Sequence, residues 1–226
     1  LGMSVKFKVE EKLPGTAGGV KNVEDFFPDT FMVVSGDLLT DFNLTDALDF
    51  HKRQGSMATL LLTRVESPLE YGVVIADKDG RVSRFLEKPG WSEVFSDTVN
   101  SGIYILEPEV FDYIPAGVDF DFSKDLFPLL LKEGQPIFGY VADGYWCDVG
   151  SIDSYIKAQV DALSGKVKLN VPGEQVMPGV WVGRSAKISS RADLKGPLVL
   201  GENCEIAPGA RIREYSVIGD NVIVAP

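Results

Sequence analysis

The chain has 226 residues, of which 45% are hydrophobic and 24% charged, a composition typical of a folded globular protein with a core of ordinary size. Its formal net charge of −11 argues against a nucleic acid as the main partner, because binding a phosphate backbone requires clustered Lys and Arg. No apolar run approaches the length of a membrane span, so no membrane partner is expected. Cys147 and Cys204 lie far apart without metal-ligand spacing, which favours a reducing, cytoplasmic compartment.

The first third of the chain alternates between strand-like and helix-like patterns. Residues 5–9 alternate apolar and polar side chains, as a strand does. After a Gly-rich loop and a helical stretch, FMVVSGD at 31–37 predicts a buried strand with an acidic tip. Residues 45–54 predict a helix that Thr45 can cap, and residues 57–65 predict another buried strand. This order predicts an α/β domain whose buried strands are mostly parallel.

The middle of the chain predicts a hairpin, a further strand and a closing helix. An Asp-Gly pair at 79–80 supplies the turn of the hairpin. Residues 99–106 predict a strand, and residues 151–164 predict a helix that begins at Ser151. The single histidine, His51, is followed by Lys52 and Arg53 in the predicted helix and is expected at the protein surface.

The last segment is the most regular part of the sequence. Aliphatic residues recur there every six positions without a break, and small residues follow four positions after most of them. The aliphatic series is Val182, Ile188, Leu194, Leu200, Ile206, Ile212, Ile218 and Val224. A fixed period of this kind is typical of a solenoid, and a hexapeptide period predicts a left-handed parallel β-helix with three six-residue sides per coil. A single amphipathic strand series is the alternative, but it does not explain a period sustained for more than forty residues.

These patterns divide the chain into three parts. Residues 1–165 form the first domain, 166–179 a Pro/Gly-containing linker, and 180–226 the start of the β-helix. We expect more sequence at both ends of the natural protein, because a strand at the first residues needs neighbours and a solenoid needs a terminal cap.

Six short motifs occur along the chain in an order that is more informative than any one of them. They are GTAGG (15–19), SGD (35–37), EYGVV (70–74), FLEKP (85–89), VNSGIYIL (99–106) and WCDVGS (146–151). With the hexapeptide repeat after them, they resemble the sugar-1-phosphate nucleotidyltransferases, and most closely the bacterial mannose-1-phosphate guanylyltransferases that carry such a repeat. The resemblance covers essentially the whole chain. It implies a Rossmann-like, GT-A-like α/β domain with a mixed sheet, followed by the left-handed parallel β-helix.

The resemblance implies that an NTP, with GTP favoured, reacts with a hexose 1-phosphate to give an NDP-sugar, most closely GDP-mannose, and pyrophosphate. Such enzymes contribute mainly positioning and charge neutralisation, because no covalent enzyme intermediate forms. By resemblance, Asp37 and Asp148 are catalytic and hold one Mg²⁺, an ion that takes hard oxygen ligands from few protein groups. Taken alone, Asp37 could equally cap a helix.

The same resemblance assigns the sugar contacts. Glu87 would bind sugar hydroxyls, and Lys88 would be a catalytic residue that binds the sugar phosphate, for which a compact ammonium is suited. A surface ion pair is the alternative for these two residues. Gly72 and Asn100 resemble positions that line the sugar pocket, the first by close backbone approach and the second by amide hydrogen bonds. Their alternatives are a plain strand-start glycine and a turn asparagine.

The nucleotide contacts assigned by resemblance are Gly15, Thr16 and Asp37. For Gly15 and Thr16 the alternative is an ordinary helix N-terminus with a threonine cap, and both descriptions could hold at once.

The sequence departs from the family at one point. The family's Gly-rich phosphate loop, with its Arg and a later Lys, does not occur in these 226 residues. We therefore expect the chain to be a fragment and to be inactive by itself. Two alternatives to GDP-mannose synthesis stay open: a glucose-1-phosphate thymidylyl-, uridylyl- or adenylyltransferase, and a non-catalytic regulatory or scaffold homologue. We also expect assembly into a homo-oligomer through the β-helix.

Overall fold

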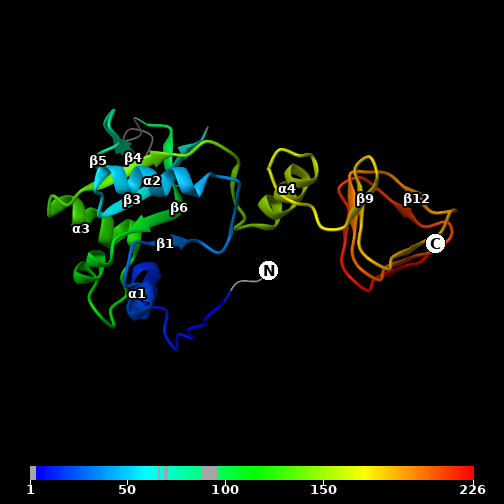
Figure 1. Cartoon of the computed structure of the whole chain (residues 1–226), viewed down its shortest axis with the longest axis horizontal. Helices are drawn as coiled ribbons and strands as arrows, with labels where there is room; N and C mark the ends of the chain where they lie inside the picture. Colours follow the sequence, from blue (N-terminus) through cyan, green and yellow to red (C-terminus); the bar gives the residue numbers. More distant parts are fainter. Residues whose placement is uncertain (1–3, 66, 69–70, 88–95) are drawn as a thin grey trace. The chain divides into compact units, whose positions relative to one another are not determined.

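The computed structural model describes residues 4–65, 67–68, 71–87 and 96–226, with only the backbone of Glu87. The chain divides into two compact units (Figure 1). Unit 1 contains residues 1–36 and 42–143, and unit 2 contains residues 37–41 and 144–226. Each unit has its own cluster of buried apolar side chains.

Unit 1 is built on a six-stranded sheet with the order β5-β4-β6-β3-β7, in which β1 also pairs with β6. Its strands are β1 (Phe31–Val34), β3 (Ala58–Arg64), β4 (Gly72–Ala76), β5 (Val82–Glu87), β6 (Thr98–Leu106) and β7 (Ile137–Val141). Among the ladders between these strands, only that of β3 with β7 is parallel. The predicted mixed sheet is confirmed, but the expectation of mostly parallel strands is wrong. The reason is that β6 runs opposite to all the strands beside it, since it pairs antiparallel with β1, β3 and β4.

The helices of unit 1 are short. They are α1 (Gly15–Lys21), α2 (Leu44–Gln54) and α3 (Phe127–Lys132), with helical turns η1 (Glu24–Phe26), η4 (Pro108–Tyr113) and η5 (Phe122–Leu126). The cap of α2 is Asn43 and not Thr45: the Asn43 side chain accepts hydrogen bonds from the backbone N–H groups of Thr45 and Asp46. Gly55 ends the helix in the left-handed conformation, with φ of 57°.

Strand β3 is buried on both faces. Leu60 and Leu62 belong to one apolar cluster with Phe127 of α3, whereas Thr59, which points to the other face, contacts α2. Figure 1 shows α2 lying across the sheet. This two-sided burial explains why the strand reads as a continuous apolar run in the sequence.

His51 of α2 is the contact of Thr59, and the prediction that this histidine lies at the surface is wrong. Its side chain is 1% exposed. Its Nδ1 lies 2.8 Å from the Thr59 hydroxyl, and its Nε2 lies 2.9 Å from a carboxylate oxygen of Glu107. The polar neighbours of His51 in the sequence could not reveal this, because Lys52 and Arg53 lie on other sides of the helix.

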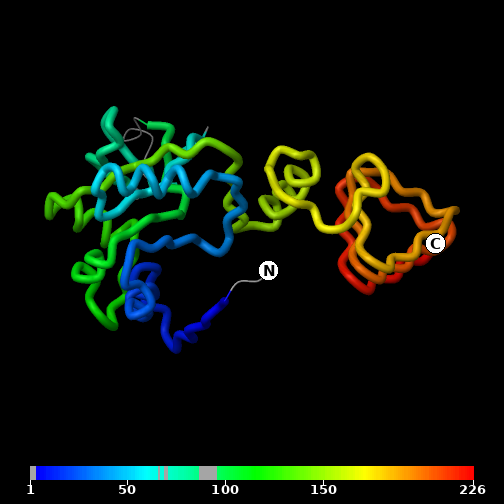
Figure 2. Tube along the Cα trace, in the orientation of Figure 1, coloured from blue at the N-terminus to red at the C-terminus, as the bar shows by residue number. Residues whose placement is uncertain are grey.

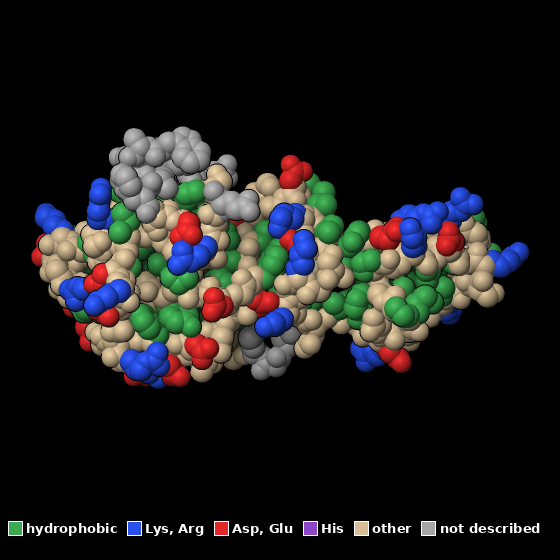
Figure 3. All heavy atoms as spheres, turned by 90° about the horizontal axis from the view of Figure 1, so that it is seen from above, with side chains coloured by type: hydrophobic (Ala, Val, Ile, Leu, Met, Phe, Trp, Pro, Cys, Tyr) green, Lys and Arg blue, Asp and Glu red, His purple; other side chains and the backbone are tan. Residues whose placement is uncertain are grey.

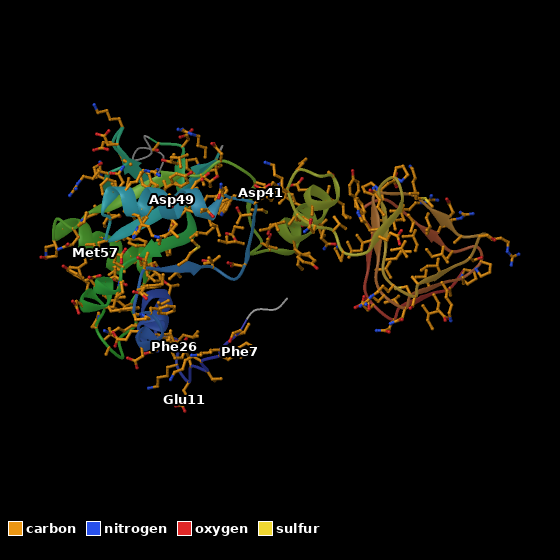
Figure 4. All side chains as sticks on the ribbon, viewed as in Figure 1. Phe7, Glu11, Phe26, Asp41, Asp49 and Met57 are labelled. Carbon is orange, nitrogen blue, oxygen red and sulfur yellow. The ribbon has the colours of Figure 1, made fainter. Side chains whose placement is uncertain are left out.

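The predicted strand at residues 5–9 does not form. These residues have no regular secondary structure, and the side chains of Val5, Phe7 and Val9 are 60%, 89% and 86% exposed. Figure 4 shows Phe7 and Glu11 on a segment that stands apart from the strands. Alternation of apolar and polar residues indicates a possible sheet face but does not provide a neighbouring strand, and this segment pairs with none of the described ones.

Unit 2 begins with a two-stranded ladder and a helix. β2 (Leu38–Thr40) pairs antiparallel with β8 (Trp146–Asp148). α4 (Ile152–Leu163) follows, and the Ser151 side chain caps it by accepting a hydrogen bond from the Ser154 N–H group, as the sequence predicts.

The rest of unit 2 consists of short strands that pair in parallel with the strands eighteen residues further on. β9 (Glu174–Met177) pairs antiparallel with β10, within the segment predicted to be a linker. The parallel sets are β10 (Val180–Val182), β13 (Leu198–Leu200) and β16 (Val217–Ile218); β11 (Lys187–Ile188), β14 (Glu205–Ile206) and β17 (Ile223–Val224); and β12 (Asp193–Leu194) with β15 (Arg211–Ile212). Figure 2 shows these strands as stacked turns of one coil.

The six-residue period fixes the core of these coils. Val182 lies opposite Leu200 and Leu200 opposite Ile218, so the predicted stacking is confirmed. Leu200 and Ile206, in the middle of the stack, are buried, whereas Ile188 at its beginning is 36% exposed. Ion pairs join successive coils on the outside, such as Arg184 with Glu202, and Figure 3 shows acidic and basic side chains interspersed there. Among the described residues, no helix has the length and apolar character needed to cross a membrane.

Candidate active site

Asp37 and Asp148, which the sequence assigns to a metal ion, lie on neighbouring backbones in unit 2. Asp37 directly precedes β2, Asp148 is the last residue of β8, and Leu38 lies opposite Asp148 in the ladder. The Val149 N–H group donates to the Asp37 carbonyl oxygen at 2.8 Å. Asp37 is exposed and Asp148 half-buried. Because Asp37 lies in a turn and not in the strand, strand alternation does not determine which way its side chain points.

The chain after β8 is shaped around the Asp148 carboxylate. The Gly150 N–H group donates to the Oδ1 atom of Asp148 at 3.1 Å. A Cβ atom on Gly150 would lie 3.2 Å from the same oxygen, so a larger residue would require the Asp148 carboxylate to shift by a few tenths of an ångström. This hydrogen bond orients the carboxylate before the chain enters α4.

Asp41 fixes the far end of the same ladder. Its Oδ2 atom accepts a hydrogen bond from the Lys168 N–H group at 2.7 Å, and its Oδ1 atom accepts one from the Tyr145 N–H group at 2.6 Å. These backbone donors, that of Lys168 first, hold the pKa of Asp41 below its ordinary value. Asp41 is labelled in Figure 4. The strand β2 is therefore held at both ends, at Asp37 and at Asp41.

The donor chemistry of Asp37 and Asp148 fits a hard divalent cation. Mg²⁺ is usually bound by one or two protein carboxylates together with waters and phosphate oxygens. In the part of the chain that the structure describes, no cluster of three or more Asp, Glu, His or Cys side chains is arranged to hold a metal ion. A closed protein cage of the kind used for structural zinc is therefore not found there. A site that used only Asp37 and Asp148 from the protein would be of the open kind, with waters and phosphate oxygens as its other ligands.

Gly15 and Thr16 lie at the start of α1 in unit 1, where both are packed against the segment before η5. A Cβ atom on Gly15, whose φ is +76°, would lie 2.5 Å from the Phe120 carbonyl oxygen. The Thr16 hydroxyl donates to an Asp121 carboxylate oxygen at 2.7 Å and accepts from the Phe122 N–H group at 3.0 Å. Thr16 is not a helix cap, because α1 has Pro14 at that position and no side-chain cap. A structural role thus accounts for both residues, and a contact with the nucleotide stays a prediction.

Asn100 lies in β6 and uses its amide group inside unit 1. Its Nδ2 atom donates to the Tyr104 hydroxyl at 2.8 Å and to the Ser123 hydroxyl at 3.3 Å. Its Oδ1 atom accepts from the Gly102 N–H group at 3.0 Å. Asn100 is therefore held in one orientation, and a sugar hydroxyl could add to these bonds only by sharing an atom that already has a partner.

The residues that link these two regions were missed in the sequence. Asp121 holds Thr16 with one carboxylate oxygen and caps η5 with the other, by accepting from the N–H groups of Ser123 and Lys124. Ser123 in turn contacts Asn100. The predicted nucleotide and sugar residues of unit 1 are therefore joined through residues 121–123. An acidic residue directly before a helical stretch was the available signal, but it indicates a cap and not its distant partner.

Two further residues assigned to the sugar, Gly72 and Glu87, lie at one end of the β4–β5 hairpin. Gly72 is buried and lies opposite Glu87 in the antiparallel register. Lys88 lies outside the described residues, and for Glu87 only the backbone is described. The register thus brings the Gly72 and Glu87 backbones together. The roles of all three residues stay predictions.

Comparison with known proteins identifies a family. The model of the nucleotidyl transferase family matches residues 1–165. A UTP–glucose-1-phosphate uridylyltransferase of Synechocystis sp. is 38% identical over 94% of the chain and 57% of its own length. A mannose-1-phosphate guanylyltransferase of Mycobacterium tuberculosis is 36% identical over 99% of the chain and 62% of its own length.

A solved structure is similar to this chain in fold. The crystal structure of HddC from Yersinia pseudotuberculosis superposes with a TM-score of 0.60 at 25% identity, over 70% of this chain and 67% of that one. The chain spans about three fifths of the length of the curated relatives named above.

Proposed function

Because the chain belongs to the nucleotidyl transferase family, we propose that it acts in the transfer of a nucleotidyl group from an NTP to a hexose 1-phosphate, giving an NDP-sugar and pyrophosphate. We propose GTP and mannose 1-phosphate as the substrates, because the guanylyltransferase of Mycobacterium tuberculosis is similar over 99% of the chain. The observation that supports this reaction most is the β2–β8 ladder, which joins the backbones at Asp37 and Asp148. One or two protein carboxylates are enough to hold Mg²⁺ together with phosphate oxygens, and the ladder brings the backbones of two such residues together.

In this reaction an oxygen of the sugar phosphate attacks the α-phosphorus of the NTP. The bond from the α-phosphorus to the bridging oxygen breaks, and pyrophosphate leaves with that oxygen, so no protein atom enters a covalent bond. Asp37 and Asp148 would hold Mg²⁺, which when bound neutralises phosphate charge. Lys88 would hold the sugar phosphate by its charge, and Glu87 would accept hydrogen bonds from sugar hydroxyls.

A second candidate is uridylyl transfer to glucose 1-phosphate. The relative from Synechocystis sp., which carries that name, is 38% identical over 94% of the chain. Both reactions use the same chemistry and differ in base and sugar. A regulatory or scaffold homologue without catalysis is a third candidate, and it would need neither nucleotide-sugar nor metal.

We also propose that the coils of residues 180–226 form a left-handed parallel β-helix and that its outer face mediates a homo-oligomer. The eighteen-residue parallel pairing supports the first proposal, since three six-residue sides complete one turn. Both cysteines are free and buried, which supports a cytoplasmic location.

Ligand binding tests the function on this chain directly. The test measures binding and not turnover, because we expect the 226-residue chain to be inactive by itself without the family's phosphate loop. Calorimetric titration in Mg²⁺ should therefore compare the two products, GDP-mannose and UDP-glucose, and then mannose 1-phosphate alone. GDP-mannose should bind more tightly than UDP-glucose, and Asp148→Asn should remove the Mg²⁺ dependence of that binding.

Two lysine substitutions test whether Lys88 binds the sugar phosphate. Lys88→Ala should weaken binding of mannose 1-phosphate about 10- to 100-fold, because a charge-assisted hydrogen bond contributes about 1.5–3 kcal/mol. Lys78→Ala, which removes an exposed lysine from the turn of the β4–β5 hairpin, should leave it unchanged. Tighter binding of UDP-glucose would favour the second candidate, and no binding of either nucleotide-sugar would favour the scaffold.

A further inference from the structure

Among the described residues, only one carboxylate is buried, that of Asp161 on α4, whose side chain is 3% exposed. Its two oxygens accept hydrogen bonds from the ammonium groups of Lys157 and Lys166, each at 2.6 Å. These lysines, Lys157 first, hold the pKa of Asp161 well below its ordinary value. Both lysine side chains are 63% exposed, so water can reach their charges. Burying the carboxylate between them is unfavourable unless its remaining hydrogen-bonding capacity is used.

A third hydrogen bond uses that capacity and leads out of the helix. The Tyr145 hydroxyl donates to the Oδ2 atom of Asp161 at 2.9 Å. Burial, and then the bond to Asp161, raise the pKa of Tyr145 well above its ordinary value. The hydroxyl therefore keeps its proton throughout the physiological range and remains a donor to Asp161.

The backbone of Tyr145 is held as firmly as its side chain. Its N–H group donates to Asp41 at 2.6 Å. Its carbonyl oxygen accepts from the Thr40 hydroxyl at 2.8 Å and from the Asp41 N–H group at 3.2 Å. Tyr145 directly precedes β8, the strand that ends three residues later at Asp148. The start of β8 is thus fixed from two sides, by β2 through the backbone and by α4 through the hydroxyl.

We propose that Tyr145 and Asp161 are positioning residues, which fix β8 so that it presents the Asp148 carboxylate to the cation. This inference rests on the proposed function, because it takes Asp37 and Asp148 as metal ligands. A carboxylate binds a cation well only if it is already oriented for binding. Residues that contact the metal ligands, but not the cation, provide this orientation. If Asp161 only stabilised α4, loss of the Tyr145 hydroxyl and loss of a lysine partner would affect metal binding alike, because each removes one hydrogen bond from the same buried carboxylate.

Three variants of the full 226-residue chain separate positioning from stability. Tyr145→Phe removes the hydroxyl and keeps the ring. Lys166→Gln removes a different bond to Asp161 without touching Tyr145 and is the matched control. Asp37→Asn removes a proposed ligand and defines which part of the binding belongs to the site. The probe is Mn²⁺, which prefers the same oxygen ligands as Mg²⁺ and whose binding is measured by water proton relaxation.

We expect Tyr145→Phe to raise the Kd of the site for Mn²⁺ about 10-fold, at the lower end of the range for residues that orient metal ligands. Lys166→Gln should leave the Kd unchanged, although thermal denaturation should show that both variants lower Tm. If Tyr145→Phe does not fold, Thr40→Val tests the same residue from its backbone side and should raise the Kd in the same direction.

The outcomes distinguish this inference from the proposed function. A wild-type Kd in Tyr145→Phe, or an equal rise in Tyr145→Phe and Lys166→Gln, would overturn the positioning role while Asp37→Asn still abolishes binding. If Asp37→Asn leaves Mn²⁺ binding unchanged, the metal site itself is wrong, and the positioning role is wrong with it.

Discussion

Unit 1 contains a mixed sheet, whereas the strands of the coils in unit 2 pair in parallel. The number of residues along the sequence between paired residues differs greatly between the two regions. In the sheet, Ala58 of β3 lies opposite Leu106 on one side and Ile137 on the other. In the coils, every parallel partner lies eighteen residues away, as with Leu198 and Val180. A sheet residue therefore depends on distant segments folding correctly, whereas a coil residue depends on the next coil alone.

Loss of a buried leucine should destabilise either unit strongly. The segments that lose hydrogen-exchange protection should differ between the two regions. Leu60 of β3 and Leu200 of β13 are both 0% exposed. Replacing either by alanine should lower the free energy of unfolding of its unit by about 2–5 kcal/mol, through lost burial and the cavity left behind. Hydrogen exchange followed by mass spectrometry should show lost protection across β1, β3, β6 and β7 for Leu60→Ala. For Leu200→Ala the loss should be confined to the neighbouring coils.

This difference between the regions would be wrong if a substitution in the coils lowered hydrogen-exchange protection as widely as a substitution in the sheet does. If Leu200→Ala exposed the amides of every coil equally, the coils would unfold as one cooperative unit. The picture of independent neighbouring interactions would then be wrong.

The same contrast explains what could be predicted from the sequence. The stacking of the coils was predictable, because one period determines which aliphatic residues lie opposite each other, although Val180 is buried without belonging to the series and Ile188 belongs to it and is exposed. In the sheet, the strands β3 and β6 were predicted within a residue or two, but their order was not, because apolar runs carry no information about neighbours. The segment at 5–9 shows the same limit, since its alternation lacks a partner strand.

The candidate site shows a further limit. Asp37 and Asp148 were selected from short motifs, and the ladder brings their backbones together. Tyr145 and Asp161 could not be found in this way, because a buried carboxylate on α4 and a hydroxyl sixteen residues earlier share no local pattern. The burial of His51 was missed for the same reason, because its partner Glu107 lies 56 residues away.

Two glycines occupy equivalent corners of the coils but have different surroundings. Their replacement by alanine should therefore change the free energy of unfolding by different amounts. A Cβ atom on Gly183 would lie 2.5 Å from the Glu202 backbone nitrogen of the next coil, whereas one on Gly219 would have no atom within 4 Å. Gly183→Ala should therefore lower the free energy of unfolding of the coils by about 1–3 kcal/mol, the usual result of overpacking. In the 226-residue chain, where no described coil follows that of Gly219, Gly219→Ala should leave it nearly unchanged in the same denaturant titration. Equal effects would mean that the corner glycines serve the backbone conformation and not the close approach of coils.

Acidification should lower the stability of unit 2 slightly through Asp161 and leave that contribution absent from unit 1. The folded-state pKa of Asp161 lies below that of an unfolded aspartate, which is about 3.9. Its ion pairs therefore stabilise unit 2 fully above that pH, and the stabilisation is lost progressively as the pH falls toward the folded-state pKa. Because both lysines are largely exposed, solvent screening keeps the gain modest. The difference in free energy of unfolding between wild type and Asp161→Asn should thus be constant from pH 7 to about 5 and shrink as the pH is lowered further. Hydrogen exchange should place this difference in α4 and the β2–β8 ladder, with the strands of unit 1 unaffected. A difference that grows on acidification would mean that Asp161 is protonated in the folded protein, and the three hydrogen bonds to its carboxylate would then need another explanation.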